Sequence, residues 1–393
     1  METLHRPIIA DSRSMEELSD NSIDLMVTSP PYPMIEMWDQ IFASFQPEIT
    51  QLLAKGDGPG AFEAMHKILD GVWAECYRVL KPGGFACINI GDATRTISED
   101  FSLYTNHARI LAAAQLLGFS SLPCILWRKQ TNAPNKFMGS GMLPAGAYVT
   151  LEHEYILILR KGGKREFKKE SDKQNRRESA LFWEERNLWF SDIWFDIKGT
   201  PQTLMAQNLG DKTARKRSGA YPFELAHRLI NMYSVKGDRV LDPFLGTGTT
   251  MAAAMAAGRN SVGYEMDASL GPAISSMANG LNVTAAPLIQ QRLVRHISFV
   301  LERMETHGPL KHTNQHYGFP VMTAQEKELL LNTPITVTPT PEHQYKVTYE
   351  SLPQKEFCKD WSALLANKEA GLLVKAMEKI LPSSKGGIQR ELF

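Results

Sequence analysis

Four consecutive residues, Ser29, Pro30, Pro31 and Tyr32, are the catalytic candidates of this chain. They follow the apolar run 23–28, which predicts a buried strand. The two prolines end that strand, because proline has no N–H to donate and holds φ at about −65°. The Ser29 hydroxyl, the Pro30 carbonyl and the Tyr32 ring could therefore grip the exocyclic amine of a nucleobase and stack on its ring. The alternative is a strand followed by a proline-rich surface turn.

A second candidate is the glycine turn that contains Gly246 and Gly248, placed between the apolar residues 240–241 and an alanine-rich run. This pattern predicts a strand, a turn that lets a ligand approach the backbone, and a helix. Glu265 ends the next short strand, 17 positions after Gly248. Its carboxylate could accept hydrogen bonds from both ribose hydroxyls of an adenosine group.

The identity of the ligand is narrowed by what this turn lacks. A dinucleotide fingerprint would need glycine where Met251 stands, and a phosphate-binding loop would need a lysine that the turn does not contain. Without a cation for phosphates, the turn favours a cofactor that has adenosine but no pyrophosphate, such as S-adenosylmethionine. The alternative is a glycine turn that only lets a helix pack against a strand.

Together these two stretches resemble the DNA amino-methyltransferases of the β class, in which the catalytic motif comes first, a recognition segment follows and the cofactor motif comes last. Residues 78–85, 152–160 and 218–225 resemble three further motifs of that family, in the family's order. The resemblance covers about residues 5–270. It implies S-adenosyl-L-methionine as cofactor, with contacts from Asp11, Thr28, Tyr221, Phe223, Asp242, Phe244, Gly246, Gly248, Thr249 and Glu265. For Asp11, a turn or helix-capping role is the alternative.

The residue before the two prolines indicates the target atom. Family members with serine there are similar to enzymes that methylate N4 of cytosine, whereas aspartate or asparagine accompanies N6 of adenine. Acceptors at Ser29 and Pro30 would draw the amine toward tetrahedral geometry and aim its lone pair at the methyl group, without a covalent enzyme intermediate. Adenine-N6 methylation and a catalytically silent DNA-recognition protein remain alternatives.

The four cysteines are scattered and have no metal-ligand spacing, so we expect no metal, no disulfide and a reducing cytoplasm as the setting. The family resemblance implies that this cytoplasm is prokaryotic. Cys124 could be the nucleophile of C5 methylation, but its apolar surroundings, 122–127, predict a buried strand. The chain shows neither a signal peptide nor a membrane-spanning run.

Forty-three basic and 43 acidic residues balance, but the basic ones cluster where the family keeps its recognition segment. We expect these clusters to contact the DNA backbone, solvated loops being the alternative. The aromatic residues of 181–195 could wedge the duplex or form a small core. The DNA-contact candidates are Lys161, Lys164, Arg165, Lys168, Lys169, Arg186, Arg215, Lys216 and Arg217.

The alternation of strand and helix patterns predicts an α/β fold, with a doubly wound, mostly parallel, seven-stranded sheet that has helices on both faces. We expect a catalytic half at 1–160, a recognition segment at 161–212, a cofactor half at 213–271 and a mostly helical extension at 272–393. The extension could bind DNA, form a dimer surface or pack against the rest. The insertion 38–60 is expected to be a flexible loop. The expected partners are duplex DNA and a separate restriction endonuclease, with the enzyme a nucleoid-associated monomer or homodimer.

Overall fold

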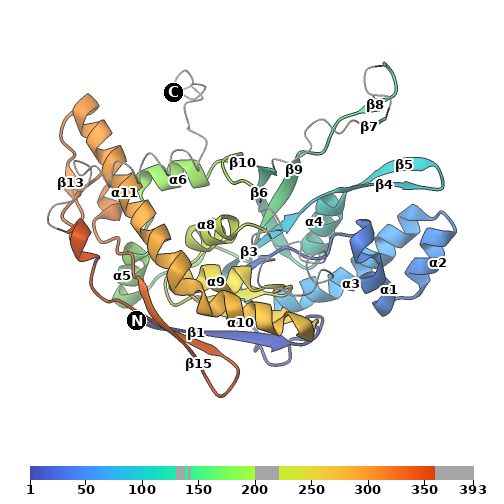
Figure 1. The fold of residues 1–393 in the computed structure, drawn as a ribbon, viewed down its shortest axis with the longest axis horizontal. Helices are drawn as coiled ribbons and strands as arrows, with labels where there is room; N and C mark the ends of the chain where they lie inside the picture. The colour runs from blue at the N-terminus through green and yellow to red at the C-terminus, as the bar shows by residue number, and fades with distance from the viewer. Residues whose placement is uncertain (130–137, 140–142, 200–220, 359–393) are drawn as a thin grey trace.

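The centre of the protein is a ten-stranded sheet with the order β10-β6-β9-β3-β2-β11-β12-β1-β16-β15 (Figure 1). This computed structural model describes residues 1–129, 138–139, 143–199 and 221–358. The strands are β1 Glu2–Ile9, β2 Ile23–Thr28, β3 Leu80–Ile90, β6 Phe119–Arg128, β9 His153–Lys161, β10 Ile193–Trp194, β11 Arg239–Asp242, β12 Asn260–Glu265, β15 Pro334–Pro339 and β16 Tyr345–Tyr349.

The seven strands predicted from sequence form the contiguous block from β6 to β1. Within it β3, β2, β11, β12 and β1 are parallel neighbours, and β9 is antiparallel to β3 and β6. The prediction of seven strands was too low for the whole sheet. Strand β10 adds to one edge, and β16 and β15, from the C-terminal extension, add antiparallel strands to the other.

Helices cover both faces of the sheet, as predicted. Successive side chains of a strand point to opposite faces, and in β2 Met26 joins the core under α3 (Gly58–Val79) and α4 (Asn106–Leu116). Its neighbours Leu25 and Val27 join the core under α8 (Phe223–Tyr233) and α9 (Thr249–Ala256). Strands buried on both faces explain why their sequences are nearly continuous apolar runs.

The insertion near the catalytic motif is helical, so the prediction of a flexible loop was wrong. It forms η1 (Glu36–Trp38), α1 (Asp39–Phe45) and α2 (Glu48–Ala54). Phe42 and Ile49 are buried against α3, which supplies the apolar contact that short helices need. These helices lie at one end of the molecule (Figure 1).

The described part of the extension, up to residue 358, contains strands as well as helices, and it packs against the rest of the chain. Phe182 of the aromatic stretch shares a core with residues of α11 (Leu281–His307) and with Tyr317 and Phe319. Of the three roles considered for the extension, packing is the one these contacts support. Residues 359–393 of the predicted helical extension lie outside the described residues. Smaller elements are β4 Ala93–Ile97, β5 Asp100–Tyr104, β7 Met138–Gly139, β8 Ala147–Tyr148, α5 Glu170–Glu178, α6 Trp183–Trp189, η3 Ala268–Leu270, α10 Gly271–Asn279, β13 His312–Thr313, β14 Pro320–Val321, η4 Ala324–Glu326 and η5 Lys355–Phe357.

The aromatic stretch 181–195 divides between core and surface. Phe182, Trp189 and Trp194 are buried, which agrees with a small core, whereas Phe190 and Phe195 are exposed. Within the described ranges, no helix has the length and apolar character needed to cross a membrane.

Candidate functional site

Both motifs open into one cavity of about 650 Å³ at the carboxyl ends of the parallel strands. Ser29 and Tyr32 follow β2, Gly246 lies in the loop after β11, and Glu265 ends β12. Parallel strands bring their carboxyl ends to one edge of a sheet, which is where ligands of open α/β sheets bind. Residues more than 200 positions apart in sequence therefore line the same space. Trp38 and Phe42 of the helical insertion form part of its wall.

A hydrogen-bonded network holds residues 29–32, the catalytic corner that follows β2. The Ser29 hydroxyl donates to the Tyr32 oxygen over 3.1 Å, and the Tyr32 hydroxyl donates to Glu154 Oε2 over 2.9 Å. Asn89 Nδ2 donates to both, at 2.8 Å from the Tyr32 oxygen and 2.7 Å from Glu154 Oε2. Lys129 Nζ pairs with Glu154 Oε1 at 2.9 Å. Because its proton is directed at Tyr32, Ser29 keeps its lone pairs free to accept.

The Tyr32 ring lies against Gly91, where a Cβ would stand 3.0 Å from Tyr32 Cε2. A side chain at position 91 would therefore displace the ring. Burial of the phenol, and then the charge of Glu154, raise the pKa of Tyr32 well above its usual value. Tyr32 therefore stays protonated and neutral at physiological pH.

Asp242 ties the two motifs together and does so from a buried position. Its Oδ1 accepts hydrogen bonds from Thr28 Oγ1 at 2.6 Å and from the Phe244 amide at 3.0 Å, and Oδ2 accepts one from Thr250. Tyr221 in turn bonds to the Thr250 hydroxyl. Burial raises the pKa of Asp242, and these hydrogen bonds oppose that shift. Its contacts make Asp242 a support of the cavity wall.

The glycine turn needs glycine at two positions, since φ is +55° at Gly246 and +92° at Gly248. Glu265 holds the turn from the next strand, with Oε2 accepting from the Gly246 amide at 2.8 Å. Burial raises the pKa of Glu265, and backbone hydrogen bonds oppose that shift. The buried hydroxyls of Thr247 and Thr249 line the cavity and find no hydrogen-bond partner in the described chain. Such unpaired groups suit a polar ligand.

The other predicted cofactor residues fall into two groups, those that line the cavity and those that lie behind its wall. Tyr221, Phe244, Thr249 and Asp11 line the cavity, whereas Thr28, Phe223 and Gly248 support it without lining it. Phe223 stacks on His227 at 5.9 Å between ring centroids. Asp11 also has the turn role that was its alternative, because its Oδ1 accepts from the Arg13 amide at 2.9 Å and its carboxylate pairs with the Arg13 guanidinium.

The first basic cluster does not lie at the cavity. Strand β9 runs antiparallel to β3, so its end at Lys161 reaches the amino ends of the parallel strands, the opposite edge of the sheet. There Lys161 donates to the Tyr77 carbonyl, and Arg165 forms two hydrogen bonds with Asp238, at 2.6 and 2.9 Å. These contacts place Lys161 and Arg165 at the edge of the sheet opposite the cavity, and DNA contact by the cluster Lys161, Lys164, Arg165, Lys168 and Lys169 stays a prediction.

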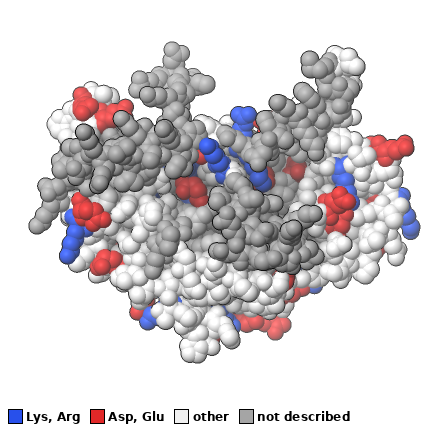
Figure 2. Space-filling model, viewed as in Figure 1, with Lys and Arg blue, Asp and Glu red and all other residues white. Residues whose placement is uncertain are grey.

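Arg186 is exposed on α6, and Arg215, Lys216 and Arg217 lie outside the described residues. On the face drawn in Figure 2, the basic side chains of the described residues are interspersed with acidic ones. The described residues of that face therefore mark no single basic patch as the DNA interface.

Three residues of the network were missed from sequence: Asn89, Lys129 and Glu154. Asn89 is the one polar side chain in the apolar run 85–90, and Glu154 is the second residue of β9. A polar residue inside a buried strand, at the edge where ligands bind, was the signal that could have found Asn89. Cys124 does not line the cavity.

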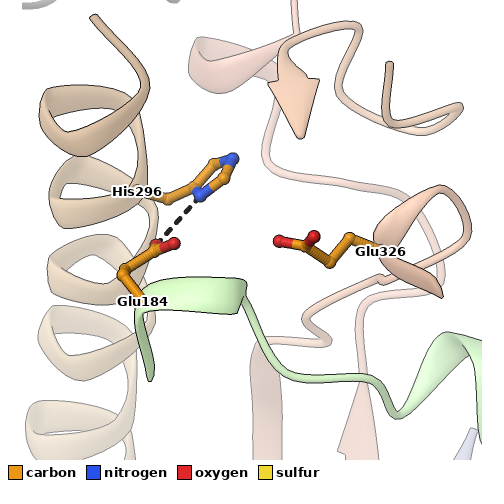
Figure 3. Close-up of side chains that lie close together, drawn as sticks. All are labelled: Glu184, His296 and Glu326. Carbon is orange, nitrogen blue, oxygen red and sulfur yellow. Dashed lines mark hydrogen bonds and ion pairs between the residues drawn. The ribbon is translucent and has the colours of Figure 1, made fainter. Parts of the chain in front are cut away.

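Among the described residues, one group has metal-ligand geometry: Glu184, His296 and Glu326, whose ligand atoms lie within 4.8 Å of one another (Figure 3). None of the three lines the cavity. His296 Nδ1 faces Glu184 Oε1 at 2.9 Å and Nε2 faces the Pro320 carbonyl at 3.1 Å, while Glu326 accepts from the Trp183 amide. Protein groups thus already occupy both nitrogens of the ring.

Comparison with known proteins agrees with this architecture. Residues 23–274 match the N6/N4 DNA methylase family. The chain is 50% identical over 358 residues to the type II methyltransferase M.MthZI of Methanothermobacter thermautotrophicus, covering 91% of this chain and 98% of that protein. It is 48% identical over 283 residues to the type II methyltransferase M.MjaI of Methanocaldococcus jannaschii, covering 69% and 90%.

A solved structure is also similar: a protein of Thermus thermophilus, assigned as a DNA modification methylase and crystallised with S-adenosyl-L-methionine. The TM-score is 0.54 at 31% identity, over 70% of this chain and 94% of that one. The family match spans both motifs of the cavity and the strands between them, and this chain is a member of the N6/N4 DNA methylase family.

Proposed function

We propose that the protein transfers a methyl group from S-adenosyl-L-methionine to the exocyclic N4 amine of a cytosine flipped out of duplex DNA. The observation that carries the proposal is the shared cavity, in which the Ser29 corner faces the glycine turn at 246–248. The similarity to type II methyltransferases supports a role as the modification enzyme of a restriction–modification system.

The residues of the cavity fit this cofactor. Glu265 would accept hydrogen bonds from the ribose hydroxyls, and Thr247 and Thr249 offer unpaired hydroxyls to its polar groups. Gly246 lets the ligand approach the backbone. When bound, the cofactor supplies an electrophilic methyl group on a sulfonium sulfur. The chain's own task is to hold the target amine in line with it.

Ser29 and Pro30 hold the amine. An aryl amine is a poor nucleophile because its lone pair is delocalised into the ring, and an acceptor on each N–H favours the tetrahedral geometry that localises the lone pair. The Ser29 oxygen has free lone pairs, because its own proton is directed at Tyr32. The Tyr32 ring, which lines the cavity, would stack on the flipped base.

Serine before the prolines favours cytosine, and adenine N6 is the second candidate because the family includes both targets. Labelled methyl transfer to duplex DNA, followed by nucleoside analysis, tests both. The expected product is N4-methylcytosine. N6-methyladenine would overturn the choice of base, and absence of label would overturn methyl transfer. Ser29→Ala should lower the single-turnover rate by about 10²-fold or more, with cofactor affinity preserved.

A further inference from the structure

We propose that Glu154 is the terminal acceptor of the proton that the target amine loses, and that the proton reaches it through Ser29 and Tyr32. This inference rests on the proposed methyl transfer. The three side chains form one line of hydrogen bonds, with 3.1 Å between Ser29 Oγ and the Tyr32 oxygen and 2.9 Å between that oxygen and Glu154 Oε2. All three line the cavity.

The direction in which each hydroxyl donates follows from the carboxylate of Glu154, at the end of the line. A carboxylate only accepts hydrogen bonds, so the single Tyr32 proton is directed at Glu154. The Tyr32 oxygen then accepts from Ser29 and from Asn89. The Ser29 oxygen consequently presents lone pairs, and no proton, to the cavity. Each oxygen in the line can thus take one proton while passing its own toward Glu154.

The second Glu154 oxygen is held by Lys129 at 2.9 Å, and an adjacent ammonium favours an ionised carboxylate. Asn89 donates its other N–H to Oε2, so Glu154 receives three hydrogen bonds from three elements of the chain. Its side chain is 12% exposed. It can therefore pass a proton on to water.

The step balances as follows. The amine lone pair forms the new N–C bond, and the C–S bond breaks with its electron pair returning to sulfur. The methylated nitrogen, now cationic, loses one proton to Ser29 Oγ, the Ser29 proton moves to the Tyr32 oxygen, and the Tyr32 proton moves to Glu154 Oε2. Ser29 and Tyr32 end unchanged, Glu154 is neutral, and its proton leaves to solvent. The high pKa of Tyr32, caused by burial and then by Glu154, keeps a proton on the phenol between turnovers.

Glu154→Gln tests the inference, because glutamine keeps an acceptor for the Tyr32 hydroxyl but cannot take a proton at neutral pH. We expect the single-turnover rate to fall by about 10²-fold or more, as is usual when a general base is lost. The pH profile of the single-turnover rate should differ between wild type and variant, because only the wild type has an ionisable group at position 154. Cofactor affinity and melting temperature serve as controls and should match the wild type.

Three companion variants separate a proton path from a structural role. Tyr32→Phe keeps the ring but breaks the line, so the double variant with Glu154→Gln should be no slower than the slower single variant. Glu154→Asp, which keeps a carboxylate, should recover part of the rate. In the protein without cofactor, Glu154→Gln should lower the pH at which Tyr32 ionises, followed by ultraviolet tyrosinate absorbance with Tyr32→Phe as the blank.

Wild-type rate and pH profile in Glu154→Gln would overturn the proton path while leaving the proposed function intact. A wild-type protein that methylates no DNA base would instead overturn the proposed function. Additive losses in the double variant would also count against a single path and would assign Glu154 a structural role.

Discussion

Two carboxylate clusters of this protein use similar side chains in opposite settings. Glu154 sits at the cavity, bonded to Tyr32, Asn89 and Lys129, and its line of hydrogen bonds ends at a serine that faces open space. Glu184 and Glu326 gather around His296 between α6, α11 and η4 (Figure 3). There the ring nitrogens face a carboxylate and a backbone carbonyl, and His296 is 0% exposed.

The difference lies in where each cluster leaves an unpaired oxygen. The cavity cluster leaves lone pairs on Ser29 that face the cavity, whereas in the sealed cluster both His296 nitrogens have protein partners and the unpaired Glu184 Oε2 is buried away from the cavity. Arg292, one turn before His296 on α11, pairs with Glu185 at 2.6 Å, so the neighbouring acids of α6 are both held by α11. The sealed cluster therefore fastens the C-terminal extension to the segment 170–195. The two clusters predict different losses: stability in one, chemistry in the other.

The largest effect should follow from breaking the sealed cluster. His296→Leu leaves Glu184 without its imidazole partner in a partly buried site, and removing one member of a buried pair costs about 3 kcal/mol. The free energy of unfolding, measured by urea denaturation, should therefore fall by about 3 kcal/mol. His296→Leu/Glu184→Leu should recover much of the loss, since no charge is then left unpaired. A single variant as stable as the wild type would remove the fastening role.

The next effect concerns the cofactor side of the cavity. Protonation turns Glu265 from an acceptor into a donor, and its pKa is raised by burial. Cofactor binding should therefore be complete above that pKa and weaken as the pH falls through it, at a higher pH than an exposed glutamate would give. Glu265→Gln should weaken binding about tenfold at neutral pH, from roughly 1.5 kcal/mol of lost hydrogen bonding, and abolish the pH dependence.

Calorimetric titration with S-adenosylhomocysteine measures this effect without turnover. Glu17→Gln is a matched control, because Glu17 accepts from the hydroxyl of the adjacent Tyr264 at 2.9 Å but does not line the cavity. If Glu17→Gln and Glu265→Gln weakened binding equally, the ribose role of Glu265 would be excluded.

Much of the fold follows from local sequence patterns, because a strand buried on both faces leaves a nearly continuous apolar run. All seven predicted strands were confirmed. Strand β16 joins the sheet by pairing with β1, and β15 joins it by pairing with β16. These long-range pairings are not encoded in a local pattern. The helices of the insertion were missed because the glycine- and proline-rich stretch 56–60 suggested a loop, while buried Phe42 and Ile49 stabilise them.

The site likewise has a part that local sequence predicts and a part that it does not. The proline motif predicts the catalytic corner and the glycine motif predicts the turn, because proline and glycine constrain the backbone by their own chemistry. Glu154 and Lys129 reach Tyr32 only because β9 runs antiparallel beside β3, a fact of topology. The same topology places the basic cluster at 161–169. Its position in the sequence suggested DNA contact, which stays a prediction, and the direction of β9 puts the start of the cluster at the edge of the sheet far from the cavity.

That far edge gives a smaller predicted effect. Arg165→Ala removes two hydrogen bonds to Asp238, which should lower the free energy of unfolding by about 1 kcal/mol. DNA affinity and its salt dependence should not change, because a residue that neutralises no phosphate releases no counterion. Filter binding across a salt series measures this. A shallower salt slope in the variant would return Arg165 to the DNA interface.

The smallest effect should come from Lys129, the exposed member of the cavity cluster. Its side chain is 47% exposed, so its ion pair with Glu154 is screened by water and contributes about 0.5 kcal/mol. Lys129→Met should therefore slow single-turnover methyl transfer roughly twofold, and added salt should reduce the difference from the wild type. Tyr32 and Asn89 hold the other Glu154 oxygen whether or not the ammonium is present. A loss as large as that of Glu154→Gln would show that Lys129 acts on the substrate itself. Lys129 would then be more than a solvent-exposed counterion of Glu154.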